Sequence, residues 1–190
     1  WIGLWPAPEG ANPTYIEEIA AIQADDLAPY FMLLGMSSWI TMLIALVFLN
    51  RSMNTGGSVA SDLAGLGAIV ALLAAAASAA NIGVGIVAAD TTFRGSQELI
   101  AAVNDAGSYA FPILLGATGI FTGLAIYLSQ SLNRIIGIIS TLLGLVLFSS
   151  AVISYPEIAD DMDLADLGFM LFTLTVVIMG ILTLRSKDEA

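Results

Sequence analysis

The residue types that most often catalyse reactions or bind metals are scarce in this chain of 190 residues. It has no cysteine and no histidine. Their absence excludes thiolate and imidazole metal sites, cysteine nucleophiles and every serine–histidine catalytic arrangement. Only carboxylates, amides, hydroxyls and a few cations remain. We therefore predict no catalytic residue, no metal site and no cofactor, and we expect that the chain is not an enzyme.

Two carboxylates could supply a functional charge because they bracket an apolar stretch. Asp62 and Asp90 lie near the two ends of residues 63–89. Proton and ion carriers place ionisable groups well inside the bilayer, whereas water or headgroups can solvate groups at the ends of a span. We therefore interpret both as interfacial residues. Asp62 is the better candidate for a functional carboxylate, because one further turn of helix could draw it inward.

A denser group of carboxylates lies between two later apolar blocks. Glu157, Asp160, Asp161 and Asp163 carry enough oxygens for Ca²⁺ or a basic partner, but the glycine and the ligand spacing of an EF-hand loop are missing. We expect no specific metal site there. An acidic surface with a single lysine would also suit a saline habitat, although we prefer an ordinary acidic extracellular face.

The amide of Asn81 is the most notable polar group within an apolar block, and Ser78 precedes it by one helical turn. A side-chain amide in hydrocarbon seeks a partner on another helix, for about 1 kcal/mol. In the structural interpretation Asn81 holds two helices together. In the functional one, Asn81 and Ser78 line a polar pocket for a solute. We prefer the structural interpretation.

Five apolar blocks must position these groups. Hydrophobic residues make up 58% of the chain and charged residues only 11%, which is far fewer charges than soluble domains carry. About 20 apolar residues suffice to cross a bilayer core. We predict an all-α integral membrane protein whose residues 29–190 form a bundle of about five transmembrane helices, at 31–49, 63–89, 109–128, 135–155 and 164–184.

Two local predictions concern the third span. Pro112 should lie in its first turn, where a missing N–H has no helical partner to lose. Residues 96–104 should form at most a short separate helix between the second and third spans.

Small residues on the third and fourth spans predict close contact between helices. Gly119 and Gly123 form a GxxxG pair, and Gly137 and Gly144 share one face at heptad spacing. Glycines at such positions let helix backbones approach closely. Packing within the bundle is the usual reason, and a dimer interface is the alternative.

Residues 1–28 form a separate extracytoplasmic or interfacial segment in this interpretation. Thr14 and Glu17 have the spacing of a capping box at the start of an amphipathic helix over residues 14–27. Trp1 and Trp5 favour the headgroup region. The helix could lie along the membrane surface or form a solvated cap on the bundle, and both alternatives stay open.

The basic residues predict an orientation, because flanking Lys and Arg stay in the cytoplasm. In a five-span chain Arg51, Arg134, Arg185 and Lys187 fall on one side, and Arg94 alone on the other. We therefore expect a cytoplasmic C-terminus and an N-terminus outside. An outside N-terminus that starts with Trp suggests a cleaved signal peptide, which we prefer, or a missing N-terminal helix.

Over about residues 111–185 the chain resembles, weakly, a family of uncharacterised bacterial multi-span membrane proteins. The similarity consists of a glycine-rich span, a short polar link with an arginine, an aliphatic-glycine pattern and a final span, here at Gly116, Gly119, Gly123, Arg134, Ile135, Ile136, Gly137, Gly180 and Arg185. The link lacks the proline and aromatic residue often seen in that family. The resemblance implies the fold and no activity.

The function that these patterns favour is structural. We expect a non-catalytic accessory or scaffolding subunit whose partners are the lipid bilayer and other membrane-protein subunits or copies of itself, and not nucleic acid. The alternative is a passive channel or carrier for a neutral or apolar solute. A membrane enzyme is a distant third.

Overall fold

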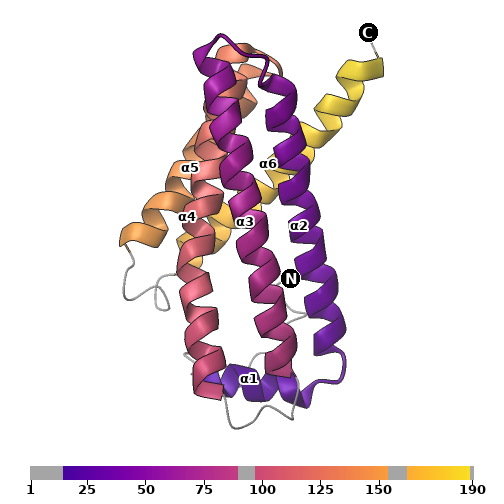
Figure 1. Ribbon diagram of the computed structural model, residues 1–190, viewed down its shortest axis with the longest axis vertical. Helices are drawn as coiled ribbons and strands as arrows, with labels where there is room; N and C mark the ends of the chain where they lie inside the picture. Colours follow the sequence, from indigo (N-terminus) through magenta and orange to yellow (C-terminus); the bar gives the residue numbers. More distant parts are fainter. Residues whose placement is uncertain (1–14, 90–96, 154–161, 189–190) are drawn as a thin grey trace. The chain divides into compact units, whose positions relative to one another are not determined.

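The computed structural model describes residues 15–89, 97–153 and 162–188. The regular secondary structure of these residues is α-helix (Figure 1). Five of the helices contain a stretch long and apolar enough to cross a membrane, which confirms the predicted all-α membrane protein. In chain order the helices are α1 (Tyr15–Ala24), α2 (Ala28–Met53), α3 (Val59–Ala89), α4 (Gln97–Ser129), α5 (Arg134–Ile153) and α6 (Met162–Asp188).

The apolar stretches overlap all five predicted spans, but the first span ends later than predicted. The sequence predicts an end at residue 49, whereas α2 continues to Met53 and its apolar stretch covers Leu33–Met53. Asn50 is therefore part of the helix and does not belong to a loop. The other stretches are Val59–Asn81, Ala110–Ser129, Arg134–Ile153 and Leu167–Arg185.

Both local predictions for the third span are wrong. Helix α4 is continuous from Gln97 to Ser129, so residues 97–104 belong to it and Pro112 lies in its interior. An interior proline removes one backbone hydrogen bond. Membrane helices tolerate this where neighbouring groups or small local adjustments satisfy the freed carbonyl. The polar residues Asn104, Asp105 and Ser108 resemble a loop in the sequence, which explains the error.

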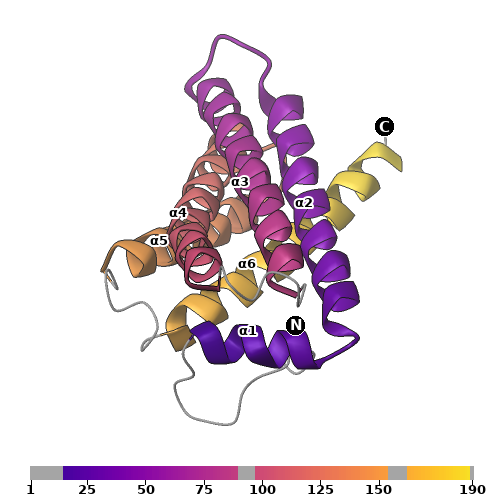
Figure 2. The same cartoon turned by 60° about the horizontal axis from the view of Figure 1, so that its bottom comes forward.

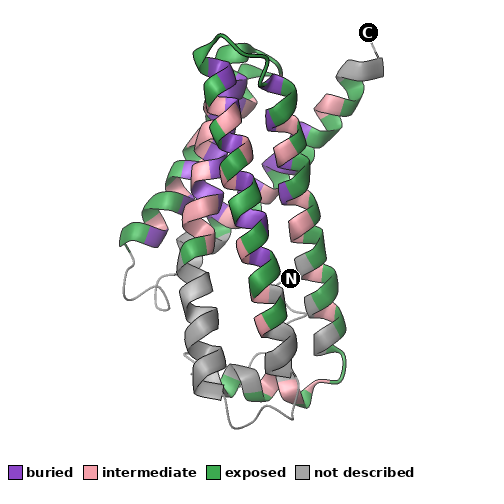
Figure 3. Ribbon diagram, viewed as in Figure 1, coloured by how far each residue is buried: buried purple, intermediate pink, exposed green. Residues whose placement is uncertain are grey.

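The chain divides into two compact units. Unit 1 comprises residues 1–41 and 75–110, and unit 2 comprises residues 42–74 and 111–190. In unit 1, Asp25 accepts a hydrogen bond from the amide of Leu27 and so turns the chain from α1 into α2. Unit 2 holds the core, because nearly all the buried residues described belong to it (Figure 3).

One half of this core lies along α2, α3 and α4. The buried residues of each helix recur at steps of three and four, which keeps them on one face and suits helices packed at a shallow angle. The face on α3 consists of small residues only, and the α2–α3 hairpin closes through the short loop 54–58 (Figure 2). The faces comprise Leu43, Leu46, Asn50 and Met53 on α2, Ala60, Ala64, Gly67, Ala71 and Ala74 on α3, and Leu115, Thr118, Thr122 and Ala125 on α4.

In the other half of the core the backbones of α4 and α5 contact each other directly at glycine residues. A methyl group at Gly144 would lie 2.6 Å from the Gly116 carbonyl oxygen, and one at Gly123 would lie 2.6 Å from the Gly137 carbonyl oxygen. The Ser140 hydroxyl donates a hydrogen bond of 3.1 Å to the Gly119 carbonyl across the same contact. No side chain larger than a hydrogen atom fits at these glycines.

Helix α6 completes unit 2 by covering this pair of helices. The ring of Phe172 is fully buried, and a methyl group at Gly119 would lie 2.7 Å from its Cε2 atom. Farther along, Phe169 meets Phe111 edge to face, with ring centroids 6.2 Å apart. Both contacts place aromatic rings from α6 against α4.

We predict that Gly144→Ala destabilises the protein by about 1–3 kcal/mol, as overpacking does, because its methyl group meets backbone atoms of α4 that cannot move aside. Gly180→Ala is the matched control. Gly180 is exposed on α6, and no described atom outside its own stretch of helix lies within 4 Å of an added methyl group, so this change should be neutral or slightly stabilising. Thermal unfolding in detergent measures both. Equal melting temperatures for the two variants would contradict the close contact.

Candidate functional site

The largest fully buried polar side chain among the described residues of unit 2 is the amide of Asn50. It is fully buried, one turn before the end of α2. Its Nδ2 donates to the Leu46 carbonyl oxygen at 2.9 Å and to the Thr122 Oγ1 at 2.8 Å. One bond lies within α2, and the other joins α2 to α4. The amide therefore holds these two helices at one relative height.

The other end of the same amide faces α3. The Asn50 Oδ1 has no hydrogen-bond partner among the described residues. A methyl group at Gly67 would lie 2.6 Å from this oxygen, so the amide occupies the space that a side chain on α3 would need. A buried carbonyl without a donor costs free energy. The Asn50 amide thus fits in shape against Gly67, and its Oδ1 is an acceptor without a donor among the described residues.

A second polar layer joins the helix ends beside this amide. The Ser61 hydroxyl donates to the Asn54 Oδ1 at 2.8 Å and accepts a bond of 2.7 Å from the Gly56 amide. Gly56 has a φ of +82°, which is readily available only to glycine, so the loop turns tightly here. These bonds fix the start of α3 against the end of α2.

The α4–α5 link touches the end of α2, next to the α2–α3 loop. The Ser131 hydroxyl, in the α4–α5 link, donates to the Met53 sulfur of α2 at 2.9 Å. The α5 helix begins with Asn133 as its cap, whose Oδ1 accepts from the Ile135 amide at 2.9 Å. Both hairpins therefore present their loops together.

The polar groups inside the described bundle are all neutral. The buried ones are Asn50, Ser61, Ser78, Thr118, Thr122, Ser140 and Thr175. Thr118 and Thr175 each donate to the carbonyl four residues earlier, as hydroxyls in apolar helices commonly do. No Asp, Glu, Lys or Arg whose side chain is described is buried. This arrangement can hold helices together, but it offers no titratable group for moving a proton.

Asp62 lies where a solvated carboxylate is expected. It is exposed in the first turn of α3, and its backbone amide donates to the Ser58 carbonyl at 3.0 Å. A carboxylate there suits the positive end of the helix dipole. Three or more His, Cys, Asp or Glu residues do not gather into a metal-binding group in the described part of the chain. Asp90, Glu157, Asp160 and Asp161 lie outside the described residues.

The remaining sequence candidates fall in both units. The structure brings Gly119 and Gly123 together with Gly137 and Gly144 in unit 2. In unit 1, Ser78 is buried and Asn81 is half-buried on α3. Whether Asn81 holds a helix or contacts a solute stays a prediction.

Sequence reasoning missed Asn50 because an amide beside Arg51 is typical of the polar boundary of a span. A signal was present, since Leu43, Leu46, Asn50 and Met53 continue one pattern of steps of three and four. Gly67 lies among alanines at the same spacing on α3, and its lack of a side chain indicates space for a group on the facing helix.

Comparisons with protein-family models, curated proteins and solved structures find no match. The weak resemblance over residues 111–185 therefore stays a prediction, and the function must be argued from the geometry.

We predict that the Gly67→Ala change destabilises the protein by about 1–3 kcal/mol because the added methyl group meets the Asn50 amide. In an Asn50→Ala background this cost should fall by at least about 1 kcal/mol, since residues in contact are energetically coupled. Unfolding free energies of the four proteins measure the coupling.

Gly83→Ala is the control for this cycle, because Gly83 lies on the same helix and an added methyl group would have no described atom within 4 Å outside its own stretch of helix. It should show no coupling to Asn50. A Gly67→Ala cost that is the same with and without the amide would refute the contact.

Proposed function

We propose that this chain is a non-catalytic membrane subunit that serves as an accessory or scaffold for partner membrane proteins. The observation that carries the proposal is that every buried polar side chain described is neutral. Ion-coupled carriers and proton pumps keep ionisable groups within the membrane. Here the Asn50 amide and the Ser140 hydroxyl donate to α4, and the hydroxyls of Thr118 and Thr175 donate to the backbone of their own helices.

The surface of the spans supports the same proposal. Large apolar side chains are exposed on each of the five apolar helices, among them Leu34, Ile69, Leu128, Ile138 and Leu174. Such faces suit lipid tails and the apolar faces of other membrane helices equally well, since association inside a bilayer depends on packing. Because contacts between helices occupy the described interior, the outer faces are the surfaces that can bind partners.

The orientation belongs to the proposal as well. Arg51 lies in the last turn of α2 and Arg134 begins α5, at the end of unit 2 where the α4–α5 link touches α2. Arg185 lies near the C-terminal end of α6, which is directed toward the same end (Figure 1). By the excess of basic residues on cytoplasmic flanks, we assign this end to the cytoplasm and the N-terminus to the outside.

One observation favours a second candidate, a passive path for a small neutral solute. The Asn50 Oδ1 has no hydrogen-bond partner within the residues that the structure describes, so it is an acceptor that a passing hydroxyl or amide donor could use. Against it, the oxygen lies so close to α3 that a methyl group at Gly67 would be 2.6 Å away, and the Asn50 Nδ2 already donates to Leu46 and Thr122.

Native mass spectrometry of the protein released from its own membrane tests the leading proposal. We expect the chain in a complex of fixed stoichiometry with other membrane proteins or with further copies of itself. A lone monomer without any associated protein, under conditions that preserve known membrane complexes of the same cell, would count against it.

Solute flux into proteoliposomes tests the second candidate. We expect water, glycerol and urea to enter no faster than into protein-free liposomes. Faster entry that Asn50→Leu abolishes, while the variant keeps its helical content, would support the solute path and displace the leading proposal.

A further inference from the structure

The end of unit 2 that carries the α2–α3 and α4–α5 loops has exposed arginines on three different helices. These are Arg51 on α2, Arg134 on α5 and Arg185 on α6, and we call them the arginine end. We propose that the arginine end binds the headgroups of anionic phospholipids. The inference goes beyond the proposed function, since it holds whether or not the chain has protein partners.

The excess of positive charge at the arginine end favours an anionic ligand. Among the side chains described in unit 2, the three arginines face a single carboxylate, that of Asp62, and no salt bridge joins them to it. The Arg134 guanidinium lies 5.8 Å from the centre of the Tyr127 ring, which leaves its N–H groups available to an anion. Guanidinium groups match phosphate oxygens in geometry and bind them in pairs.

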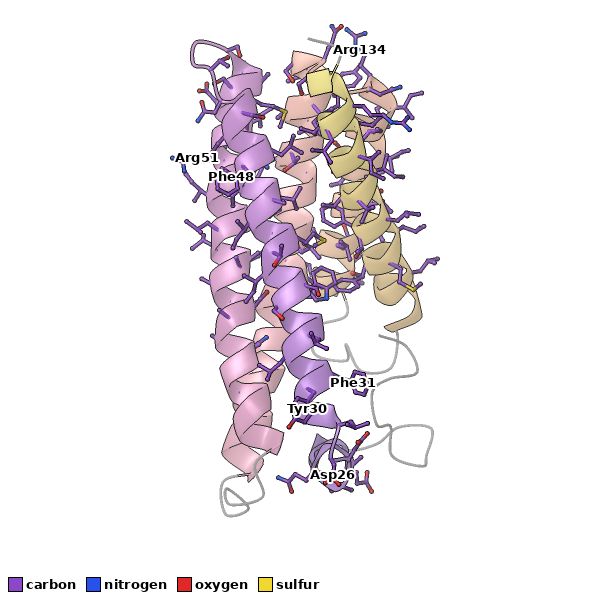
Figure 4. All side chains as sticks on the ribbon, turned by 90° about the vertical axis from the view of Figure 1, so that its right-hand side faces the viewer. Asp26, Tyr30, Phe31, Phe48, Arg51 and Arg134 are labelled. Atoms are coloured by element: carbon purple, nitrogen blue, oxygen red, sulfur yellow. The ribbon has the colours of Figure 1, made fainter. Side chains whose placement is uncertain are left out.

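Each arginine also has an apolar neighbour on the side toward the middle of its span. Arg51 is followed toward mid-span by Phe48, Arg134 by Ile138, and Arg185 by Ile181, each three or four residues away and thus on the same helix face. Phe48 is 66% exposed, Ile138 46% and Ile181 48%. Figure 4 labels Phe48 and Arg51 on successive turns of α2, with Arg134 at the same end of unit 2.

This pairing fits an amphiphile and not a free anion. A phospholipid carries its phosphate at the membrane surface and its acyl chains directly below, which is the order of arginine and apolar side chain on all three helices. Inorganic phosphate would use the arginines but gain nothing from Phe48, Ile138 or Ile181. A basic residue near the surface of an anionic membrane strengthens association about fivefold.

Spin-label electron paramagnetic resonance on the protein in phosphatidylcholine vesicles tests the proposal. Trace amounts of spin-labelled phosphatidylglycerol or spin-labelled phosphatidylcholine report the fraction of each lipid held at the protein surface. We expect several-fold preference for phosphatidylglycerol at low salt, and a decrease when salt screens the charges. Phosphatidylglycerol stands for the anionic class.

The variant Arg51→Gln/Arg134→Gln/Arg185→Gln should bring the preference close to one, and each single change should remove part of it. Asp62→Asn is the matched control, because it changes an exposed charge at the same end and should keep or increase the preference. If the triple variant does not fold, as judged by its thermal transition, the three single variants decide the question.

Equal association of the two lipids with the unmodified protein would overturn the proposal, as would an unchanged preference in the arginine variants. Addition of inorganic phosphate to the vesicles, with ionic strength kept constant by chloride, separates the two sources of phosphate. Displacement of the labelled lipid by phosphate would also overturn it, since the arginines would then bind the free ion.

Discussion

The close approach of helix backbones at small residues is the constraint on which unit 2 depends. Within a bilayer the lipid tails are as apolar as leucine, so helices associate through contact and hydrogen bonds and not through exclusion of water. Gly116, Gly123, Gly137 and Gly144 bring α4 and α5 so near that an added methyl group would meet backbone atoms. Dispersion forces between such surfaces are weak individually and large in sum, so the contact must be continuous to be useful.

The buried amide of Asn50 fixes the axial position of one helix relative to another, which packing alone does not do. A face of alanines and glycine on α3 could slide against its neighbours at little cost. The bond to Thr122 and the fit against Gly67 are available at one register only. A single polar residue in an apolar helix seam has the same effect in coiled coils, where it selects the register at some cost in stability. The Oδ1, which has no hydrogen-bond partner in the described part of the chain, is that cost here.

Composition was sufficient to predict the class and the number of spans, because each apolar block had to satisfy its own backbone within lipid. Boundaries and partners were harder. Asn50 resembles the end of a span in sequence, and only the position of Thr122, 72 residues later, shows that the amide is buried. Pro112 resembles a first-turn residue because proline usually marks a helix boundary, whereas α4 continues through it. A long-range contact decided the case of Asn50, and local patterns do not contain it.

The proposed function requires that helix packing closes the interior of unit 2 to water and polar solutes. The chain has no cysteine, so a single introduced thiol can be labelled without background. The most direct measurement is the reaction of Thr118→Cys with a water-soluble maleimide in membranes, compared with Thr55→Cys. Thr118 is fully buried, and Thr55 is exposed in the α2–α3 loop. We predict that the cysteine at 55 reacts and the cysteine at 118 does not. Labelling of both cysteines at similar rates would contradict a closed interior.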